Sequence, residues 1–240
     1  IGHFIPSAIF AALSGAMPGR LMAPGADPIW LSVWRGENPP FTLTVFQVGG
    51  TGARPTKDGL SAVGFPSGVA GVPAEVIESL SPVVLKRREL RADSGGAGTW
   101  RGGLGQLTEF ARRGQGRWSV SSIADRTQYP APGLLGGKAG ATGEVRLANG
   151  AKLHAKALID LKPDDVVHVN LPGGGGYGDP LKRDVERVRW DVIEGYVTPE
   201  EAEKNYGVAV RYTGKPDDLV KLPELWQIDR EKTNRLRGGR

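Results

Sequence analysis

The chain carries four consecutive glycines, Gly173 to Gly176, within the stretch Leu-Pro-Gly-Gly-Gly-Gly-Tyr-Gly-Asp-Pro that covers residues 171–180. This stretch follows an apolar alternation that ends at Asn170. No side chain in the run can fill a core, so the run serves the geometry of the backbone. Glycine accepts positive φ angles and the close approach of another backbone or a ligand, at an entropic cost. The segment therefore predicts either a demanding turn or a binding site.

Three of these glycines, Gly173, Gly175 and Gly178, match the G-x-G-x-x-G pattern of dinucleotide-binding loops. That pattern requires a helix that opens directly on the loop and an acidic residue at a second strand about 20 residues later. Here Asp179-Pro180 interrupts, and no Lys-Ser or Lys-Thr follows as in a phosphate-binding P-loop. We therefore favour a structural turn over nucleotide binding.

The composition narrows the class of protein. Among 240 residues there are 36 glycines and 18 prolines without a collagen-like period, which indicates many turns and short strands. The absence of cysteine removes thiol nucleophiles, thiolate metal sites and disulfides, and favours a cytoplasmic location. Three scattered histidines do not suggest a zinc site within the chain, so we expect no metal ligands here.

The charge and hydropathy patterns argue against two kinds of partner. The net charge of +5 is spread thinly and is not interleaved with aromatic residues, so we expect no nucleic-acid binding. No apolar run approaches the 18 or so residues that a membrane span needs, so we expect no membrane partner. The apolar stretch at residues 1–17 lacks a basic leader, and we expect a buried helix over 6–16.

Alternating apolar residues predict a β-rich body whose strands are joined by glycine-rich loops. In residues 41–48, for example, Phe41, Leu43, Val45 and Gln47 fall on one face. The other expected strands cover residues 29–35, 83–90, 106–112, 118–124, 143–147 and 166–170, with a short helix at 73–79. We expect an α+β fold in which residues 1–180 form this body.

The pattern changes after Pro180 and predicts an α-hairpin over residues 181–213. Asp184 can cap a helix that Gly195 ends. Thr198 begins a second helix, with Pro199 at its first position, Glu201 three residues after the cap, and Gly207 as the stop. From residue 214 to residue 240 the periodicity fades, and we expect an extended basic tail.

The short motif Asp93-Ser94-Gly95-Gly96 is similar to the nucleophile loop of chymotrypsin-like proteases. Such a serine needs a histidine base and an orienting aspartate. The only upstream histidine is His3, in a helical context, so the sequence does not support a serine nucleophile.

Several loops, taken in order, resemble the C-terminal portion of the hydantoinase B/5-oxoprolinase family. The matching stretches are Gly49 to Pro55 with Lys57-Asp58-Gly59, Glu89-Leu90-Arg91 through Asp93 to Gly105, Asp125-Arg126, Pro172 to Pro180, and the α-hairpin that ends Tyr206-Gly207-Val208. Ordered motifs over most of the chain are far more specific than one glycine pattern. Residues after about Gly214 are not covered by the resemblance.

The resemblance implies ATP-dependent hydrolysis of a small cyclic amide, such as a hydantoin or 5-oxoproline, by a hetero-oligomer. ATP and Mg would act through a hydantoinase A-like ATPase subunit. Family members are longer, and their upstream part carries an Asn-Asp-Pro-Tyr motif followed by a histidine and an aspartate that are expected to bind a divalent metal. No Asn-Asp-Pro-Tyr occurs here, so the resemblance assigns that metal to an N-terminal half of the B-type polypeptide, as a further partner.

Within the chain, charged groups on glycine-rich loops at strand ends are the candidate site residues. We predict catalytic roles for Arg54, Lys57, Asp58, Asp125 and Arg126, and substrate contact by Gly49, Gly50, Thr51 and Gly52. A cationic side chain could stabilise charge on the amide oxygen or hold phosphate, and an aspartate could orient water. An internal Arg–Asp pair that fixes the loop is the alternative.

Two other functions stay open from the sequence. A component of an ATP-dependent acetone or acetophenone carboxylase belongs to the same family and shares the use of ATP. A non-catalytic assembly module is the non-enzymatic alternative, and we expect the chain to be inactive on its own.

Overall fold

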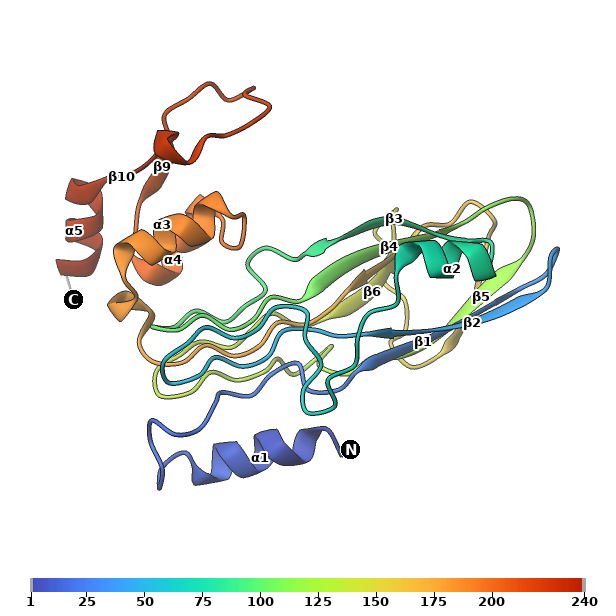
Figure 1. The fold of residues 1–240 in the computed structure, drawn as a ribbon, viewed down its shortest axis with the longest axis horizontal. Helices are drawn as coiled ribbons and strands as arrows, with labels where there is room; N and C mark the ends of the chain where they lie inside the picture. Colours follow the sequence, from blue (N-terminus) through green and yellow to red (C-terminus); the bar gives the residue numbers. More distant parts are fainter. Residues whose placement is uncertain (1, 239–240) are drawn as a thin grey trace.

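The body of the protein is a β-sandwich, seen in a computed structural model that describes residues 2–238 (Figure 1). Both sheets are antiparallel and four-stranded. The first has the order β2-β1-β5-β7 and contains β1 (Trp30–Gly36), β2 (Phe41–Gln47), β5 (Trp118–Ile123) and β7 (Leu158–Leu161). The second has the order β3-β4-β8-β6 and contains β3 (Val83–Leu90), β4 (Gln106–Arg112), β6 (Glu144–Leu147) and β8 (Val167–Asn170). The α+β class and seven of these strands are as predicted; β7 was not anticipated.

The core lies between the two sheets and is dominated by aromatic rings. Trp34 of β1 is fully buried, and its ring centroid lies 4.6 Å from that of Phe110 on β4 in the opposite sheet. Trp118 of β5 stacks beside Trp34 at 5.4 Å. In β2, Leu43, Val45 and Gln47 are buried in alternation, as the sequence predicts, because successive side chains point to opposite faces.

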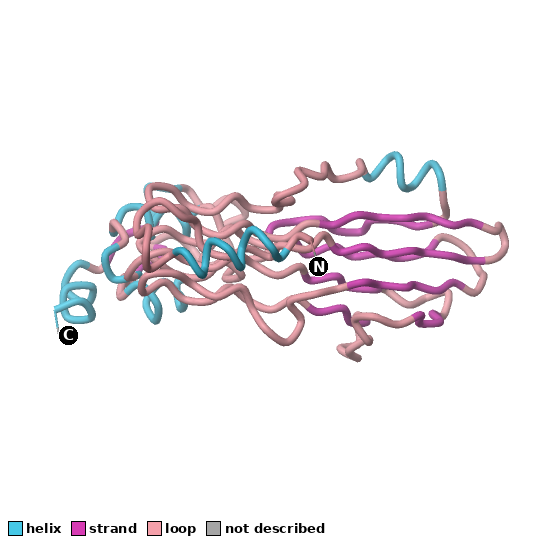
Figure 2. The backbone as a smooth tube through the Cα atoms, turned by 90° about the horizontal axis from the view of Figure 1, so that it is seen from below, coloured by secondary structure: helices cyan, strands magenta, loops and turns pink. Residues whose placement is uncertain are grey.

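The glycine-rich segments form a bundle of extended chains that continues from one end of the sandwich (Figures 1 and 2). Its chains are joined by backbone hydrogen bonds, such as Gly50 N–H to Pro172 O at 3.0 Å and Gly174 N–H to Gly103 O at 2.9 Å. A Cβ atom on Gly50 would lie 1.8 Å from the carbonyl oxygen of Gly103, and one on Gly174 would lie 2.0 Å from that of Thr51. Only glycine fits at such a spacing, so the glycine run serves backbone packing.

The α-hairpin is present as predicted, and its caps are those expected from the sequence. It consists of α3 (Val185–Ile193) and α4 (Pro199–Tyr206), preceded by a 3-10 turn at Pro180–Lys182. Asp184 accepts a hydrogen bond from Arg187 N–H, and Thr198 accepts one from Glu201 N–H. Gly207 ends α4 in the left-handed conformation, with φ of 62°.

Residues 214–238 differ from the extended tail that we predicted for residues 214–240, of which 239 and 240 lie outside the described residues. Strand β10 (Trp226–Ile228) pairs with β9 (Val210–Tyr212), a 3-10 turn covers Pro223–Leu225, and α5 covers Arg230–Gly238. Helix α5 is polar, so its sequence carries no strong apolar period. Hydrogen bonds to α4 hold the helix in place. Arg237 Nε donates to Tyr206 O at 3.0 Å, and Lys232 Nζ donates to Glu203 Oε2 at 2.7 Å.

Helix α1 (Phe4–Leu13) forms near the expected position, but the prediction that it is buried is wrong. Ser7 is its buried residue, whereas Ile5, Ile9 and Leu13 are 40% exposed or more. The helix lies beside the glycine bundle, outside the sandwich (Figure 1). Helix α2 (Ala74–Leu80) packs on β3. Within residues 2–238, no helix has the length and apolar character that crossing a membrane requires.

Candidate functional site

Asp125 and Arg126 lie just after β5, where the sandwich meets the glycine bundle. The Arg126 Nη2 atom lies 2.5 Å from Oδ2 of Asp27, and the guanidinium carbon lies 5.0 Å from the ring centroid of Phe4 in α1. Asp125 Oδ1 is 2.6 Å from Lys156 Nζ. Of the two, Arg126 is the more buried, and it connects this loop to the N-terminal region.

Asp27 is a member of this site that the sequence analysis missed. Its side chain is fully buried, and Ser7 of α1 donates a hydrogen bond of 2.6 Å to its Oδ1 atom. Burial raises the pKa of Asp27 above its ordinary value, against the opposing effect of the bonds from Ser7 and Arg126. One signal could have found it: Asp27 is the single charged residue between positions 21 and 34.

A cavity of about 480 Å³ lies against this loop. Its polar lining includes a guanidinium, an ammonium, an imidazole, a phenol and the carboxylate of Asp125, together with the uncharged side chains of Thr127 and Gln128. Its lining consists of Phe4, Ala124, Asp125, Arg126, Thr127, Gln128, Tyr129, His154, Ala155 and Lys156. We call it the Arg126 cavity. Its volume falls in the range of small-molecule sites, and its cationic groups suit a ligand that carries or develops negative charge.

Arg54, Lys57 and Asp58 lie in a different part of the bundle, and their contacts are with other groups. Asp58 forms a bidentate pair with Arg183, with Nη1–Oδ1 at 2.7 Å and Nη2–Oδ2 at 2.9 Å. The Asp58 carbonyl accepts a hydrogen bond from Arg54 Nη2 at 3.0 Å, and Lys57 is exposed. The structure therefore does not bring this loop together with Asp125 and Arg126.

The pair of Asp58 and Arg183 belongs to a larger ionic network at the base of the α-hairpin. Arg183 also contacts Asp191 of α3 at 2.8 Å, and Arg101 Nε lies 3.3 Å from the same carboxylate. Desolvation would raise the pKa of Asp58, but the hydrogen bonds and charge of Arg183 outweigh it and lower that pKa. These contacts are those of an internal Arg–Asp pair, the alternative role considered for this loop.

Gly49, Gly50, Thr51 and Gly52 lie within the glycine bundle, where all four are buried. Thr51 N–H donates to Leu60 O, and its Oγ1 atom accepts from Leu60 N–H at 2.8 Å. None of the four lines the Arg126 cavity. Their contacts give them a structural part in the bundle, and substrate contact by them stays a prediction.

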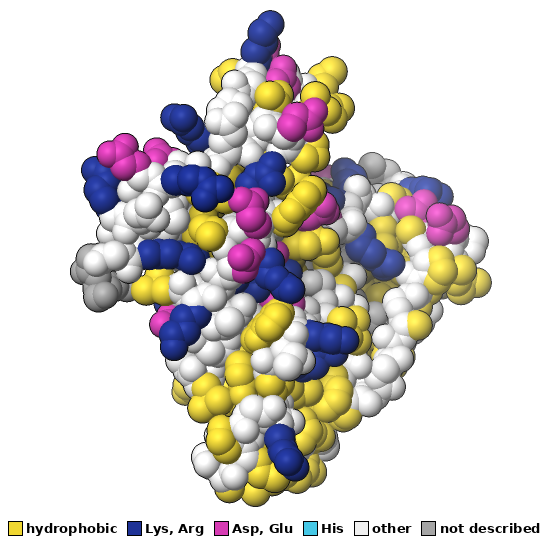
Figure 3. Space-filling view, turned by 60° about the vertical axis from the view of Figure 1, so that its left-hand side comes forward, with side chains coloured by type: hydrophobic (Ala, Val, Ile, Leu, Met, Phe, Trp, Pro, Cys, Tyr) yellow, Lys and Arg dark blue, Asp and Glu magenta, His cyan; other side chains and the backbone are white. Residues whose placement is uncertain are grey.

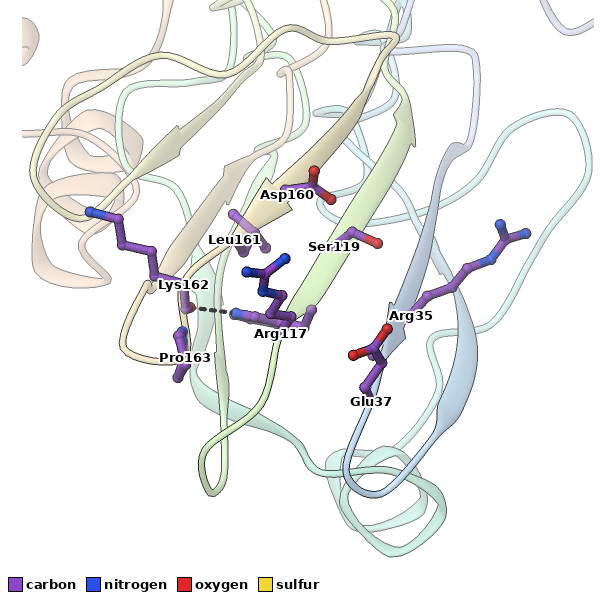
Figure 4. Close-up of a pocket in the computed structure, with 10 residues that line it drawn as sticks. Arg35, Glu37, Arg117, Ser119, Asp160, Leu161, Lys162 and Pro163 are labelled. Carbon is purple, nitrogen blue, oxygen red and sulfur yellow. Dashed lines mark hydrogen bonds between the residues drawn. The ribbon is translucent and has the colours of Figure 1, made fainter.

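A second cavity, of about 540 Å³, lies at the tip of the sandwich (Figure 4). It is lined by groups of both charge signs, among them Arg35, Glu37, Arg117, Asp160 and Lys162. Trp118 Nε1 donates to Lys162 O at 2.7 Å along its wall. No residue that the sequence analysis selected lines this cavity.

Ser94 has the contacts of a structural residue. It is fully buried, donates to Arg91 O at 2.5 Å and accepts from Gly105 N–H at 2.9 Å. As for metals, no group of three or more His, Asp or Glu side chains with ligand geometry occurs within residues 2–238.

Comparison with known proteins gives relatives that align with most of the chain. It is 29% identical to a B-type D-/L-hydantoinase subunit from Pseudomonas sp. (strain NS671) over 98% of its length, and 31% identical to the beta subunit of the Pseudomonas jessenii caprolactamase over 90%. It is 32% identical to the acetophenone carboxylase delta subunit of Aromatoleum aromaticum over 78%. The chain spans only 39%, 40% and 31% of these three proteins.

The fold has a counterpart among solved structures. The crystal structure of the ATP-dependent caprolactamase from Pseudomonas jessenii superimposes with a TM-score of 0.74 at 26% identity, covering 95% of this chain and 40% of that one. The family model described as hydantoinase B/oxoprolinase matches residues 1–180, which contain the sandwich, the glycine bundle and the Arg126 cavity. The chain therefore belongs to the hydantoinase B/oxoprolinase family.

Proposed function

We propose that the chain acts as part of a B-type subunit that hydrolyses a small cyclic amide, such as a hydantoin or 5-oxoproline, with ATP consumed by an A-type partner subunit. The observation that carries this proposal is the extent of the similarity. In sequence, the hydantoinase and caprolactamase subunits match 98% and 90% of the chain, whereas the acetophenone carboxylase delta subunit matches 78%.

The chemistry explains why ATP is needed. An unactivated cyclic amide is a poor electrophile, and transfer of a phosphoryl group to its oxygen lowers the barrier to attack by water. Overall, the ring C–N bond breaks and ATP gives ADP and phosphate, with two waters consumed. A carboxylate forms together with an amine from 5-oxoproline or a ureido group from a hydantoin. We assign ATP and Mg to the A-type partner, and a divalent metal to the portion of the B-type subunit that the relatives carry outside the aligned region.

In this scheme the Arg126 cavity receives the substrate or its phosphorylated form. Arg126 and Lys156 supply positive charge next to a developing oxyanion or a phosphoryl group, and Asp125 orients Lys156 through their 2.6 Å contact. Arg54, Lys57 and Asp58 lie away from this cavity and have a structural role in this scheme. The Asp58 carboxylate fixes the α-hairpin through Arg183, and the Asp58 carbonyl holds the loop by its hydrogen bond from Arg54.

The test is ATP hydrolysis stimulated by hydantoin or 5-oxoproline, measured with this chain, the complementary part of a B-type subunit and an A-type subunit. Lys156→Ala is the informative variant, because Lys156 is exposed and its removal leaves the buried Asp27–Arg126 pair intact. Lys86→Ala, an exposed lysine on β3 of the other sheet, is the matched control. We expect Lys156→Ala to lower the stimulated turnover by about tenfold or more, and Lys86→Ala to leave it unchanged.

A carboxylase subunit is the second candidate, because the acetophenone carboxylase delta subunit is 32% identical over 78% of the chain. Adding bicarbonate with a ketone in the same assay separates the two activities. Turnover that requires bicarbonate would contradict the hydrolase. Stable assembly of the chain with the other subunits, without turnover of either cyclic amides or ketones, would identify a non-catalytic assembly module instead.

A further inference from the structure

The outer face of the first sheet is apolar where it adjoins the glycine bundle. Leu31 of β1 lies opposite Phe46 of β2 on one side and opposite Ile123 of β5 on the other. Phe46 is 44% exposed and Ile123 is 53% exposed. These three side chains make one apolar row across three strands.

The next row along the strands is also uncharged. Val33 lies opposite Thr44 on β2 and Ser121 on β5, and Ser121 lies opposite Leu158 of β7, which is 63% exposed. Charged side chains flank these rows at both ends. Arg35 and Asp160 lie one row further toward the tip of the sandwich, and Asp125 and Lys156 lie beyond Ile123, at the Arg126 cavity. We call the two uncharged rows the outer apolar face.

The side-chain pattern of strand β1 indicates that another protein segment packs on this face. Trp30 and Trp34 point into the core, whereas Leu31 and Val33 point outward, so the strand is apolar on both sides. A sheet with one wet face alternates apolar and polar residues, and strands that are apolar on both sides are typical of sheets covered on both faces. Helix α2 packs on β3 of the other sheet. Figure 2 shows α1 alongside the glycine bundle, not across the strands.

Helix α1 carries a second exposed apolar stripe, and its Phe4 lines the Arg126 cavity together with the loop that follows β5. Ile5, Ile9 and Leu13 stand at successive i+4 positions and are exposed, and no residue of the helix is charged. Phe4, at the start of the helix, packs against Arg126, which follows β5. In the space-filling view, hydrophobic side chains gather at the lower end of the molecule, where Figure 1 places α1 (Figure 3).

We propose that the outer apolar face and the exposed stripe of α1 are the docking surface for the remaining part of a B-type subunit. The inference rests on the proposed function. Only 40% of the caprolactamase beta subunit and 39% of the B-type hydantoinase subunit correspond to this chain, so most of each relative must be accommodated beside it. Protein interfaces commonly have an uncharged centre and a charged rim, and the outer apolar face has this arrangement, with Arg35 and Asp160 at one edge.

The absence of cysteine makes the face directly testable, because an introduced cysteine is the single thiol of the chain. Thr44→Cys places a thiol on the outer apolar face, on its edge strand β2, and Leu219→Cys places one in a fully exposed loop near the C-terminus as the control. The probe is the part of the Pseudomonas jessenii caprolactamase beta subunit outside the aligned region, tagged and co-expressed with each variant. The measurement is the rate of maleimide labelling, located by mass spectrometry, in the isolated chain and in the complex.

We expect the chain to co-purify with the probe and labelling at Thr44→Cys to slow by about tenfold or more in the complex, while Leu219→Cys changes by less than about twofold. Phe46→Glu should abolish co-purification, whereas Thr56→Glu, at an exposed position of the Lys57 loop, should not. Unchanged labelling within an intact complex, or no complex at all, would overturn the proposal. If the isolated chain has the mass of a dimer and its Thr44→Cys variant is labelled slowly, the face binds a second copy of the chain. That result would also overturn the proposal.

The ATPase assay separates this inference from the proposed function. A protected Thr44→Cys in a complex that shows no turnover with cyclic amides would support the docking surface and contradict the activity. Turnover without protection would support the activity and contradict the docking surface.

Discussion

Asp27 and Arg126 form a buried ion pair, 2.5 Å between Oδ2 and Nη2, that joins two loops 99 residues apart in the sequence. Both residues have left-handed backbones, with φ of 56° each. Through Ser7, which also bonds Asp27, the pair fixes helix α1 against the loop that lines the Arg126 cavity. The position of a candidate substrate-binding arginine therefore depends on a carboxylate from a distant segment.

Replacing Asp27 tests this dependence. Asp27→Asn removes the counter-charge of the buried Arg126 guanidinium but also the desolvation cost that raises the pKa of Asp27, so we expect a net loss of about 2 kcal/mol in the free energy of unfolding. Ser7→Ala removes one neutral donor to the same carboxylate and should cost about 1 kcal/mol. Urea denaturation followed by tryptophan fluorescence measures both. Equal effects of the two variants would show that the charge of the pair is unimportant.

The ion pair of Asp58 and Arg183 predicts that the free energy of unfolding depends on pH. Because Arg183 lowers the pKa of Asp58 below its ordinary value of 3.8, the folded protein binds this proton at lower pH than the unfolded chain does. The stability from this group is therefore fully present above the ordinary value and is lost as the pH falls through the lowered pKa. Urea midpoints between about pH 7 and pH 3 should fall less steeply in Asp58→Asn than in the wild type. Parallel curves would contradict this coupling.

The glycine bundle predicts a sharp contrast between two glycine substitutions. Gly50→Ala would place its Cβ 1.8 Å from the Gly103 carbonyl oxygen, so the chains must separate, and we expect a loss of about 3 kcal/mol or more. Gly71→Ala meets no atom within 4 Å and should stay within about 1 kcal/mol of the wild type. Thermal unfolding of the two variants makes the comparison. Similar melting temperatures would mean that the bundle is not closely packed at Gly50.

Tyr206 offers a substitution that should stabilise the protein. Its ring is 2% exposed, and its hydroxyl is buried without a hydrogen-bond partner in the described part of the chain. Tyr206→Phe removes that hydroxyl and keeps the packing of the ring, so we expect a gain of about 1 kcal/mol in unfolding free energy. A loss of similar size, measured by urea denaturation, would instead reveal a bonded hydroxyl.

Features that depend on neighbours in sequence could be predicted from sequence. The α-hairpin is the clearest case, because Thr198, Pro199 and Gly207 act within one or two turns of helix α4. Strands β2, β3 and β4 were found within one residue for a similar reason: alternation of apolar side chains is a local property of the strand. The order of the family motifs was likewise available without coordinates.

What the sequence by itself determined, then, was the family, the α+β class and the position of most strands and of the α-hairpin, since propensity, capping and alternation act over a few residues. Tertiary structure alone decided the rest. Asp27 pairs with Arg126, and Asp58 with Arg183, across 99 and 125 positions, and no local pattern specifies such partners. The exposure of α1 and the apolar second side of β1 are likewise properties of what packs beside them, because burial is fixed by contacts between distant segments.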